Sequence, residues 1–163
     1  MYTDWGRGGQ EEAASSRPMR SKTERKRHVL RMLESGNKLW IATASEDESA
    51  HLVPFSFVWD GERIIAATSE GSPAARNARR TGKARVALGT FGDVVLIDVH
   101  ATVTAYDGID AAVAERLARV SALDGRSSPS VAYLQLTPWR VQAWWSLQEL
   151  ARPTIMRSGR WVV

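Results

Sequence analysis

The stretch HLVPFSFVWDGERIIAATSEGSPAARNARRTGKARVAL, from His51 to Leu88, decides the fold and holds the candidate site. Its aromatic and β-branched run over 51–59, the Asp60-Gly61 turn and the apolar run over 63–68 predict a β-hairpin. Pro54 cannot donate a hydrogen bond to a neighbouring strand, so its strand is expected at a sheet edge or bulged there.

A helix is predicted to begin directly after the hairpin. Ser72 is a natural N-cap and Pro73 suits the first turn. The N-terminus of a helix offers free amide groups and a partial positive charge, and Arg76 lies one turn further on. Thr68 and Ser69 add hydroxyl donors from the end of the strand. These residues predict a site for an anionic cofactor; a capped helix with an exposed basic face is the alternative.

Composition excludes several classes of protein. The chain has 163 residues, 44% of them hydrophobic and 25% charged, as in ordinary globular domains. There is no cysteine, which excludes disulfides, thiolate catalysis and Cys-ligated metal sites. No apolar run approaches the ~20 residues of a membrane helix, and no signal peptide is recognisable, so a cytoplasmic protein is expected. The net charge of +4 fits nucleic acid, anionic lipid or phosphorylated small molecules.

Residues 1–19 are rich in Gly, Ser, Glu and Arg and are predicted to be a flexible extension, which leaves 20–163 as the domain. Ser21 and Glu24 have the spacing of a capping box, and Gly36 is a plausible end of that helix. Its basic face is interpreted as solvated, with a nucleic-acid footprint as the less favoured alternative. That face carries Lys22, Arg25, Lys26, Arg27 and Arg31.

The remainder of the chain predicts further strands at 39–44, 83–89, 94–106, 131–137 and 139–146, the last two separated by Pro138. Alternation over 94–106 places Ile97, Val99 and Ala101 on one buried face. A helix after Asp110 is expected to lie across a barrel mouth or sheet face. The predicted class is therefore mainly β (α+β), an antiparallel sheet that closes into a barrel. Three scattered histidines give no metal-binding spacing.

The order of these motifs resembles the pyridoxamine-phosphate-oxidase-like, FMN-binding split β-barrel superfamily. The motifs are H-x-V-P-x-S-F-x-W-D-G, a strand that ends in A-T-S, and S-x-x-x-R-N-x-R-R. R-V-Q-A-W at 140–144 and the closing M-R-S-G-R-W are similar to its actinobacterial branches, so the resemblance covers 24–163. It implies a six-stranded antiparallel split β-barrel with Greek-key connections and a few short helices. It also implies a homodimer with two cofactor sites at the subunit interface.

The resemblance implies roles for individual residues. The phosphate end of the cofactor would be held by Thr68, Ser69, Ser72, Arg76 and Asn77. The flavin ring would lie along His51, Val53, Pro54 and Phe55, with Arg80 as a further candidate. Trp144 or Trp145 of the partner subunit would close over the ring. Ala74 and Ala75 stand where the family often has another basic residue, which favours FMN over the deazaflavin coenzyme F-420.

Members of the superfamily use FMN or F-420 to move hydride equivalents to or from small organic molecules, so a flavin- or deazaflavin-dependent oxidoreductase is expected. A non-catalytic barrel that binds flavin or haem as a carrier or sensor is the alternative. The cofactor performs the difficult chemistry, so no side chain is nominated as catalytic and no metal is expected. The substrate is not predictable from sequence.

Overall fold

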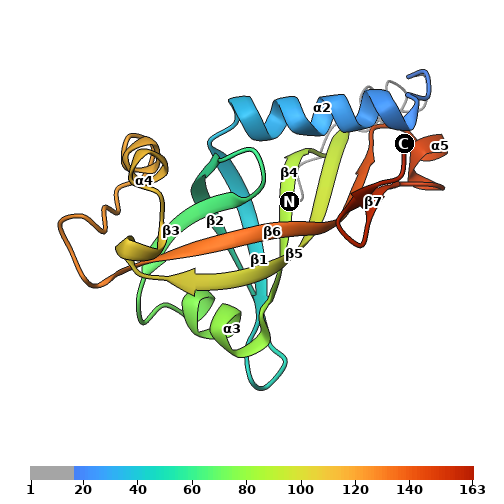
Figure 1. Cartoon of the computed structure of the whole chain (residues 1–163). Helices are drawn as coiled ribbons and strands as arrows, with labels where there is room; N and C mark the ends of the chain where they lie inside the picture. Colours follow the sequence, from blue (N-terminus) through green and yellow to red (C-terminus); the bar gives the residue numbers. More distant parts are fainter. Residues whose placement is uncertain (1–16) are drawn as a thin grey trace, which may run out of the picture.

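The structure is a computed structural model that describes residues 17–163. Strands dominate the chain, and short helices lie around them (Figure 1). In chain order the elements are α2 (Lys22–Ser35), β1 (Lys38–Ala44), β2 (Ala50–Trp59), β3 (Ile64–Ser69), α3 (Pro73–Thr81), β4 (Lys83–Thr90), β5 (Asp93–Thr104), the 3₁₀ turn η1 (Tyr106–Gly108), α4 (Ala111–Ala118), β6 (Val131–Trp144), α5 (Leu147–Leu150), β7 (Thr154–Arg157) and β8 (Arg160–Trp161).

Six of the strands close into an antiparallel barrel. Their order is β3-β2-β1-β4-β5-β6, and β3 also pairs with β6, so that the sheet has no free end. β7 and β8 extend the sheet beyond β6. Closure satisfies the backbone groups that an open antiparallel sheet would expose at its edges. The predicted class, a mainly β six-stranded antiparallel barrel, is confirmed.

The barrel is weakly joined at β2, which bears on the candidate site. β2 pairs with β1 from Ala50 to Ser56, but with β3 only from Phe57 to Trp59. The first half of β2 is therefore an edge, and Pro54 lies in it. The sequence predicted this arrangement, because an edge position does not require the hydrogen bond that proline lacks.

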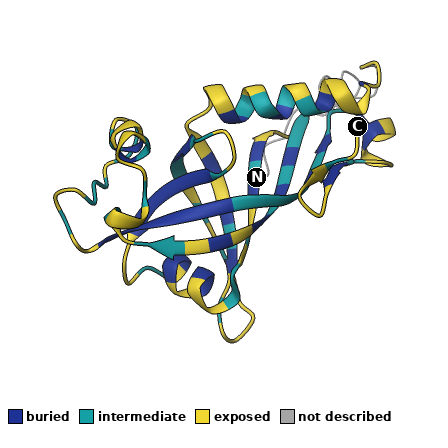
Figure 2. Cartoon of the chain, in the orientation of Figure 1, coloured by how far each residue is buried: buried dark blue, intermediate teal, exposed yellow. Residues whose placement is uncertain are grey.

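Two helices close the main core from different sides. In Figure 1, α2 lies along the top of the strands and α3 below them. Val29 and Leu33 of α2 and Ala74 and Ala78 of α3 are all buried in one cluster with the inward side chains of the strands. A second cluster forms under α4, where Leu117 packs against outward residues of β3 and β6. Figure 2 shows these strands as the most buried part of the molecule.

One strand prediction was wrong. The segments 131–137 and 139–146 form a single strand, β6, which passes through Pro138 without interruption. The pairing with β5 shifts there: Asp98 lies opposite Arg140, whereas Val99 lies opposite Pro138, so Trp139 is an extra, bulged residue. A bulge leaves one backbone group unpaired, which accommodates a proline within a long strand.

The first 16 residues of the predicted extension lie outside the described residues. Of the following ones, Arg17 donates to the Gly92 carbonyl and the Pro18 carbonyl accepts from the indole of Trp145. Within residues 17–163, no helix has the length and apolar character needed to cross a membrane.

Candidate cofactor site

Helix α3 begins where β3 ends, and the junction gathers most of the predicted phosphate-binding residues. We call Thr68, Ser69, Ser72, Arg76 and Asn77, with His51 beside them, the α3 corner. Ser72 caps the helix: its side chain accepts a hydrogen bond from the Ala75 amide, as predicted. Gly82 ends the helix in the left-handed conformation, with φ of 64°. The nine-residue helix is thereby fixed at both ends.

Hydroxyl groups are held at the start of the helix. Thr68 Oγ1 donates to Ser72 Oγ at 2.8 Å, and the Ser72 amide donates to the Ser69 carbonyl at 2.9 Å. Ser69 is exposed and Ser72 half-buried, so an anion can reach both. Helix N-termini of this kind bind phosphate or carboxylate groups through their free amides and dipole. The hydroxyls and amides of the α3 corner fit the phosphate end of a flavin cofactor.

Asn77 and His51 are both neighbours of Thr43 in β1. The buried Asn77 side chain donates to Thr43 Oγ1 at 3.0 Å, and Thr43 lies directly opposite His51 in the β1–β2 pairing. His51 Nδ1 is buried and has no hydrogen-bond partner within residues 17–163. An unpaired buried nitrogen costs free energy unless something binds it. Asn77 thus joins α3 to β1, while His51 offers one free polar atom beside the helix.

Three arginines give the corner its positive charge. Arg76 donates to the Gly71 carbonyl, and Arg79 pairs with Glu70; all of these groups are exposed. Arg80 donates to the carbonyls of Ala44 and Ser45 at 2.8 and 2.7 Å, which ties the end of α3 to the β1–β2 loop. Arg76 therefore faces the start of the helix, whereas Arg80 is engaged at its other end.

The β1–β2 loop near Arg80 carries an ionised acid. Hydrogen bonds from Ser45 and Ser49 lower the pKa of Asp47 to about 2. This carboxylate is exposed and is held within its own loop. It therefore orders the turn between β1 and β2.

The ring-binding candidates on β2 alternate between two sides. His51, Val53 and Phe55 are half-buried, and Phe55 packs against the main core. Pro54 lies on the opposite, exposed side, where it lines a hollow of about 760 Å³ with Trp40, Ala87 and Phe91 among others. A flavin ring bound along β2 would lie at the edge of the strand that has no paired neighbour.

Trp144 and Trp145 lie far from the α3 corner in the same subunit. β6 begins at Val131, opposite Ser69, and ends at Trp144, opposite Val94. At about 3.3 Å per residue the ends of this 14-residue strand lie roughly 40 Å apart along its path. The two tryptophans therefore lie at the other end of β6 from the residue that pairs with Ser69.

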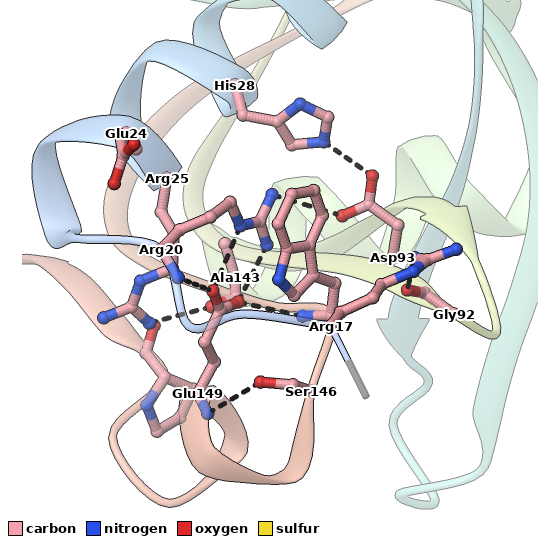
Figure 3. Close-up of polar contacts among 12 residues, drawn as sticks. Arg17, Arg20, Glu24, Arg25, His28, Gly92, Asp93, Ala143, Ser146 and Glu149 are labelled. Atoms are coloured by element: carbon pink, nitrogen blue, oxygen red, sulfur yellow. Dashed lines mark hydrogen bonds and ion pairs between the residues drawn. The ribbon is translucent and has the colours of Figure 1, made fainter. Parts of the chain in front are cut away.

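A buried polar network lies elsewhere in the described chain, and no pattern in the sequence predicted it. We call Arg20, Arg25, His28, Asp93 and Glu149 the Arg20 cluster (Figure 3). Glu149 accepts hydrogen bonds from the Arg20 backbone, Nε and Nη2 at 2.7, 3.1 and 2.8 Å, and from the Trp145 amide at 2.9 Å. His28 Nε2 lies 2.6 Å from Asp93 Oδ2. Ser146 caps α5 and so places Glu149 in this network.

The prediction that the basic face of α2 is solvated was wrong for Arg25. Its guanidinium is buried and Nη1 donates to the carbonyls of Ala143 and Arg152, both at 3.0 Å. Burial lowers the pKa of this group from its usual value, and Glu149 nearby opposes that shift. The carbonyl of Ala143 in β6 and that of Arg152 after α5 accept its hydrogen bonds, which compensates for the burial of the guanidinium.

Within the described residues, no three acidic or histidine side chains come together in a way that could hold a metal ion. The polar groups of the α3 corner are hydroxyls, amides and guanidinium groups, which suit an anion rather than a cation.

The closed six-stranded barrel, the edge at β2 and the helix that follows β3 define a split β-barrel protein. The chain belongs to the pyridoxamine 5'-phosphate oxidase family, whose model matches residues 26–145. The matched region includes the whole α3 corner. Among curated proteins, none matches the chain.

Solved structures share the fold at low sequence identity. General stress protein 26 from Bacillus anthracis has a TM-score of 0.60 and 15% identity, over 73% of this chain and 92% of that one. An F420 reductase has a TM-score of 0.57 and 13% identity, over 68% of this chain and 93% of that one. PhzG from Burkholderia lata, solved with tetrahydrophenazine-1-carboxylic acid, has a TM-score of 0.56 and 20% identity, over 78% and 81%.

Proposed function

We propose that the protein is a flavin-dependent oxidoreductase that moves hydride equivalents to or from a small organic molecule. The observation that carries the proposal is the α3 corner. It combines a capped helix start, two accessible hydroxyls and Arg76, and Asn77 of the same helix is linked through Thr43 to the strand that carries His51 with its unpaired Nδ1. Similar folds occur in proteins named F420 reductase and PhzG.

The chain's own residues would bind and orient the cofactor. Ser69, Ser72 and Arg76 would hold the phosphate, and the edge of β2 would align the ring. When bound, a flavin supplies the hydride chemistry itself. The nearby arginines stabilise negative charge at this end of the barrel.

FMN is favoured over coenzyme F-420 because of Ala74 and Ala75. These residues are 1% and 0% exposed, and Ala74 belongs to the main core. A lysine or arginine would not fit at either position without disrupting that core. The helix therefore lacks an additional basic group that would help to hold a longer polyanionic tail.

The proposed active form is a homodimer. Trp40, Leu52 and Phe91 are 49%, 58% and 106% exposed on the side of the sheet where Pro54 lies. Apolar patches of this kind often mark protein interfaces. In such a dimer, Trp144 or Trp145 of the partner would approach the cofactor, as the resemblance to the family implies.

Titration of the apoprotein with FMN and with F-420 tests the cofactor assignment. Arg76→Ala should weaken FMN binding about tenfold or more, the expected loss for one charge-assisted hydrogen bond to phosphate. Arg119→Ala on α4 removes the same charge from an exposed residue far along the chain and should leave the affinity unchanged. Equal FMN affinity in wild type and Arg76→Ala would refute the assignment. Bleaching of the flavin by a nicotinamide donor would support an enzyme, and a flavin that stays oxidised would favour a carrier.

Light scattering after gel filtration tests the dimer. Leu52→Glu should give a monomer that binds FMN weakly, because a charge cannot be buried in an apolar interface without a partner. Leu147→Glu is the matched control, since Leu147 is 72% exposed on α5. A Leu52→Glu protein that remains dimeric would place the interface elsewhere.

A further inference from the structure

A second hollow lies between α2 and the end of β6, away from the α3 corner. It measures about 220 Å³ and is lined by Arg20, Glu24, Arg27, His28, Arg31 and Trp145. We call it the Arg27 pocket. Figure 3 shows His28 above Asp93, and the Arg20 side chain between Asp93 and Glu149.

The helix presents its basic groups to one side. Glu24, Arg27, His28 and Arg31 are spaced at three, four and seven residues, so they share one face of α2. The single acid among them is already engaged: Glu24 accepts hydrogen bonds from the amide and the hydroxyl of Ser21, both at 2.7 Å. The side chains of Arg27 and Arg31 make no hydrogen bond or ion pair with any other residue of 17–163.

The inner wall of the Arg27 pocket is fixed before any ligand arrives. The Arg20 side chain is only 7% exposed, and two of its nitrogens are held by Glu149. Its guanidinium lies 3.7 Å from the centroid of the Trp145 ring. The indole N–H of Trp145 donates to the Pro18 carbonyl at 3.0 Å, which holds the ring in place. A pre-organised wall loses little entropy on binding.

Arg20 also keeps one unsatisfied donor. Its Nη1 is buried and has no hydrogen-bond partner within the described chain. The nearest acid oxygen, Asp93 Oδ1, is 3.6 Å away, too far for a hydrogen bond, and is unpartnered itself. Arg20 therefore adds a fixed positive charge to the inner wall, with Nη1 turned toward Asp93.

We propose that the Arg27 pocket binds the phosphate or carboxylate group of a small, ring-sized molecule. Arg20 is paired with Glu149, His28 with Asp93, and Glu24 is hydrogen-bonded by Ser21. The exposed side chains of Arg27 and Arg31 therefore supply the positive charge that is available to a ligand. The volume is below the roughly 300–1,000 Å³ of sites for larger ligands. Because the groups surround a hollow with a buried arginine, they favour a small molecule over a nucleic-acid backbone, which would need an extended basic surface. The proposal does not depend on the flavin.

Phenyl phosphate and benzoate are suitable probes, and the NMR signal of the Trp145 indole N–H is a local readout. That signal is assigned by its disappearance in Trp145→Phe. The full chain should show a saturable shift of this signal with both anions. Arg27→Ala and Arg31→Ala should each weaken binding about tenfold, since each removes one charge-assisted contact. Both residues are exposed, so the variants should fold normally.

Two further variants sharpen the test. Lys22→Ala removes the same charge from an exposed residue of α2 outside the pocket and should change the affinity less than about twofold. Glu24→Gln keeps the capping box but removes the negative charge, so it should bind anions more tightly. The absence of a saturable shift at millimolar probe concentration would overturn the proposal. It would also be overturned if Arg27→Ala and Arg31→Ala bound the probes as tightly as the wild type. Equally tight binding of neutral benzyl alcohol would show an apolar site. Displacement of phenyl phosphate by duplex DNA, dependent on Arg27 and Arg31, would show a nucleic-acid surface.

Discussion

The α3 corner and the Arg20 cluster are both polar, but they are built in opposite ways. In the corner, Thr68, Ser72 and Arg76 are linked by contacts between residues four or five positions apart, and several groups remain exposed. In the cluster, Arg20 and Glu149 are separated by 129 positions, and both are almost fully buried. The corner leaves donors free for a ligand, whereas most donors of the cluster are used within the protein.

This difference predicts separate consequences of substitution. Free donors contribute to binding and little to folding, because water satisfies them in the absence of a ligand. A buried ion pair contributes to folding rather than to binding, because removal of one partner leaves a buried charge without compensation. Substitutions in the cluster should therefore reduce stability, and those at the exposed residues of the corner should reduce cofactor affinity.

The largest effect is expected for Glu149→Gln. The variant leaves the buried Arg20 guanidinium without its main counter-charge, which should cost about 3–5 kcal/mol of unfolding free energy. Urea denaturation measures this loss. Glu115→Gln is the control, because Glu115 forms an exposed pair with Arg119 at 2.8 Å, and its loss should cost less than about 0.5 kcal/mol. Similar costs for the two variants would contradict the distinction between cluster and surface.

The same residue predicts a pH dependence. Burial raises the pKa of Glu149, but hydrogen bonds from Arg20 and from the Trp145 amide outweigh it, so the pKa lies below its ordinary value of 4.5. A carboxyl whose folded pKa is lowered stabilises the protein above its unfolded pKa, and this contribution is lost as the pH falls toward the folded value. As the pH falls below the ordinary carboxyl pKa of 4.5, the wild type should lose more stability than Glu149→Gln. Parallel curves would show that Glu149 is not held ionised.

Local sequence signals account for the parts of the fold that were predicted correctly. The capping box at Ser21 and the N-cap at Ser72 depend on residues three positions apart, and the edge position of Pro54 follows from its missing N–H. Each signal acts within a few residues, so it can be read before the tertiary structure is known. The alternation around Val99 was equally local.

The errors have tertiary causes. From the sequence, Pro138 is predicted to end a strand. In the fold, a shift in the register between β5 and β6 accommodates it within β6. From the sequence, Arg25 is predicted to be solvated, but the tertiary fold buries it against the carbonyls of Ala143 and Arg152. No pattern in the sequence relates Arg20 to Glu149, because their contact depends on how α5 packs against the start of the domain. Such contacts require the complete fold.

Asn77 tests whether the effect of a substitution on stability depends on the burial of the residue or on its location in the α3 corner. It belongs to the α3 corner but is only 6% exposed, and its side chain donates to Thr43 at 3.0 Å. If burial decides, Asn77→Ala should lower the unfolding free energy by about 1–3 kcal/mol, because Thr43 loses its partner. The exposed Arg76→Ala should stay within about 0.5 kcal/mol of wild type. The double variant Thr43→Val/Asn77→Ala should cost less than the sum of the single ones, since both polar groups are then removed.

The smallest change in stability, and the sharpest separation of folding from binding, is expected at Ser72. Ser72→Ala removes the N-cap of α3 and should cost about 1 kcal/mol. Ser72→Asp keeps a capping oxygen and complements the helix dipole, so its thermal unfolding should be close to that of the wild type. The aspartate places a negative charge where the cofactor phosphate is proposed to bind, so FMN affinity should fall more in Ser72→Asp than in Ser72→Ala. If the two variants ranked in the same order for stability and for FMN affinity, the cap alone would explain Ser72, and the phosphate would have to bind elsewhere.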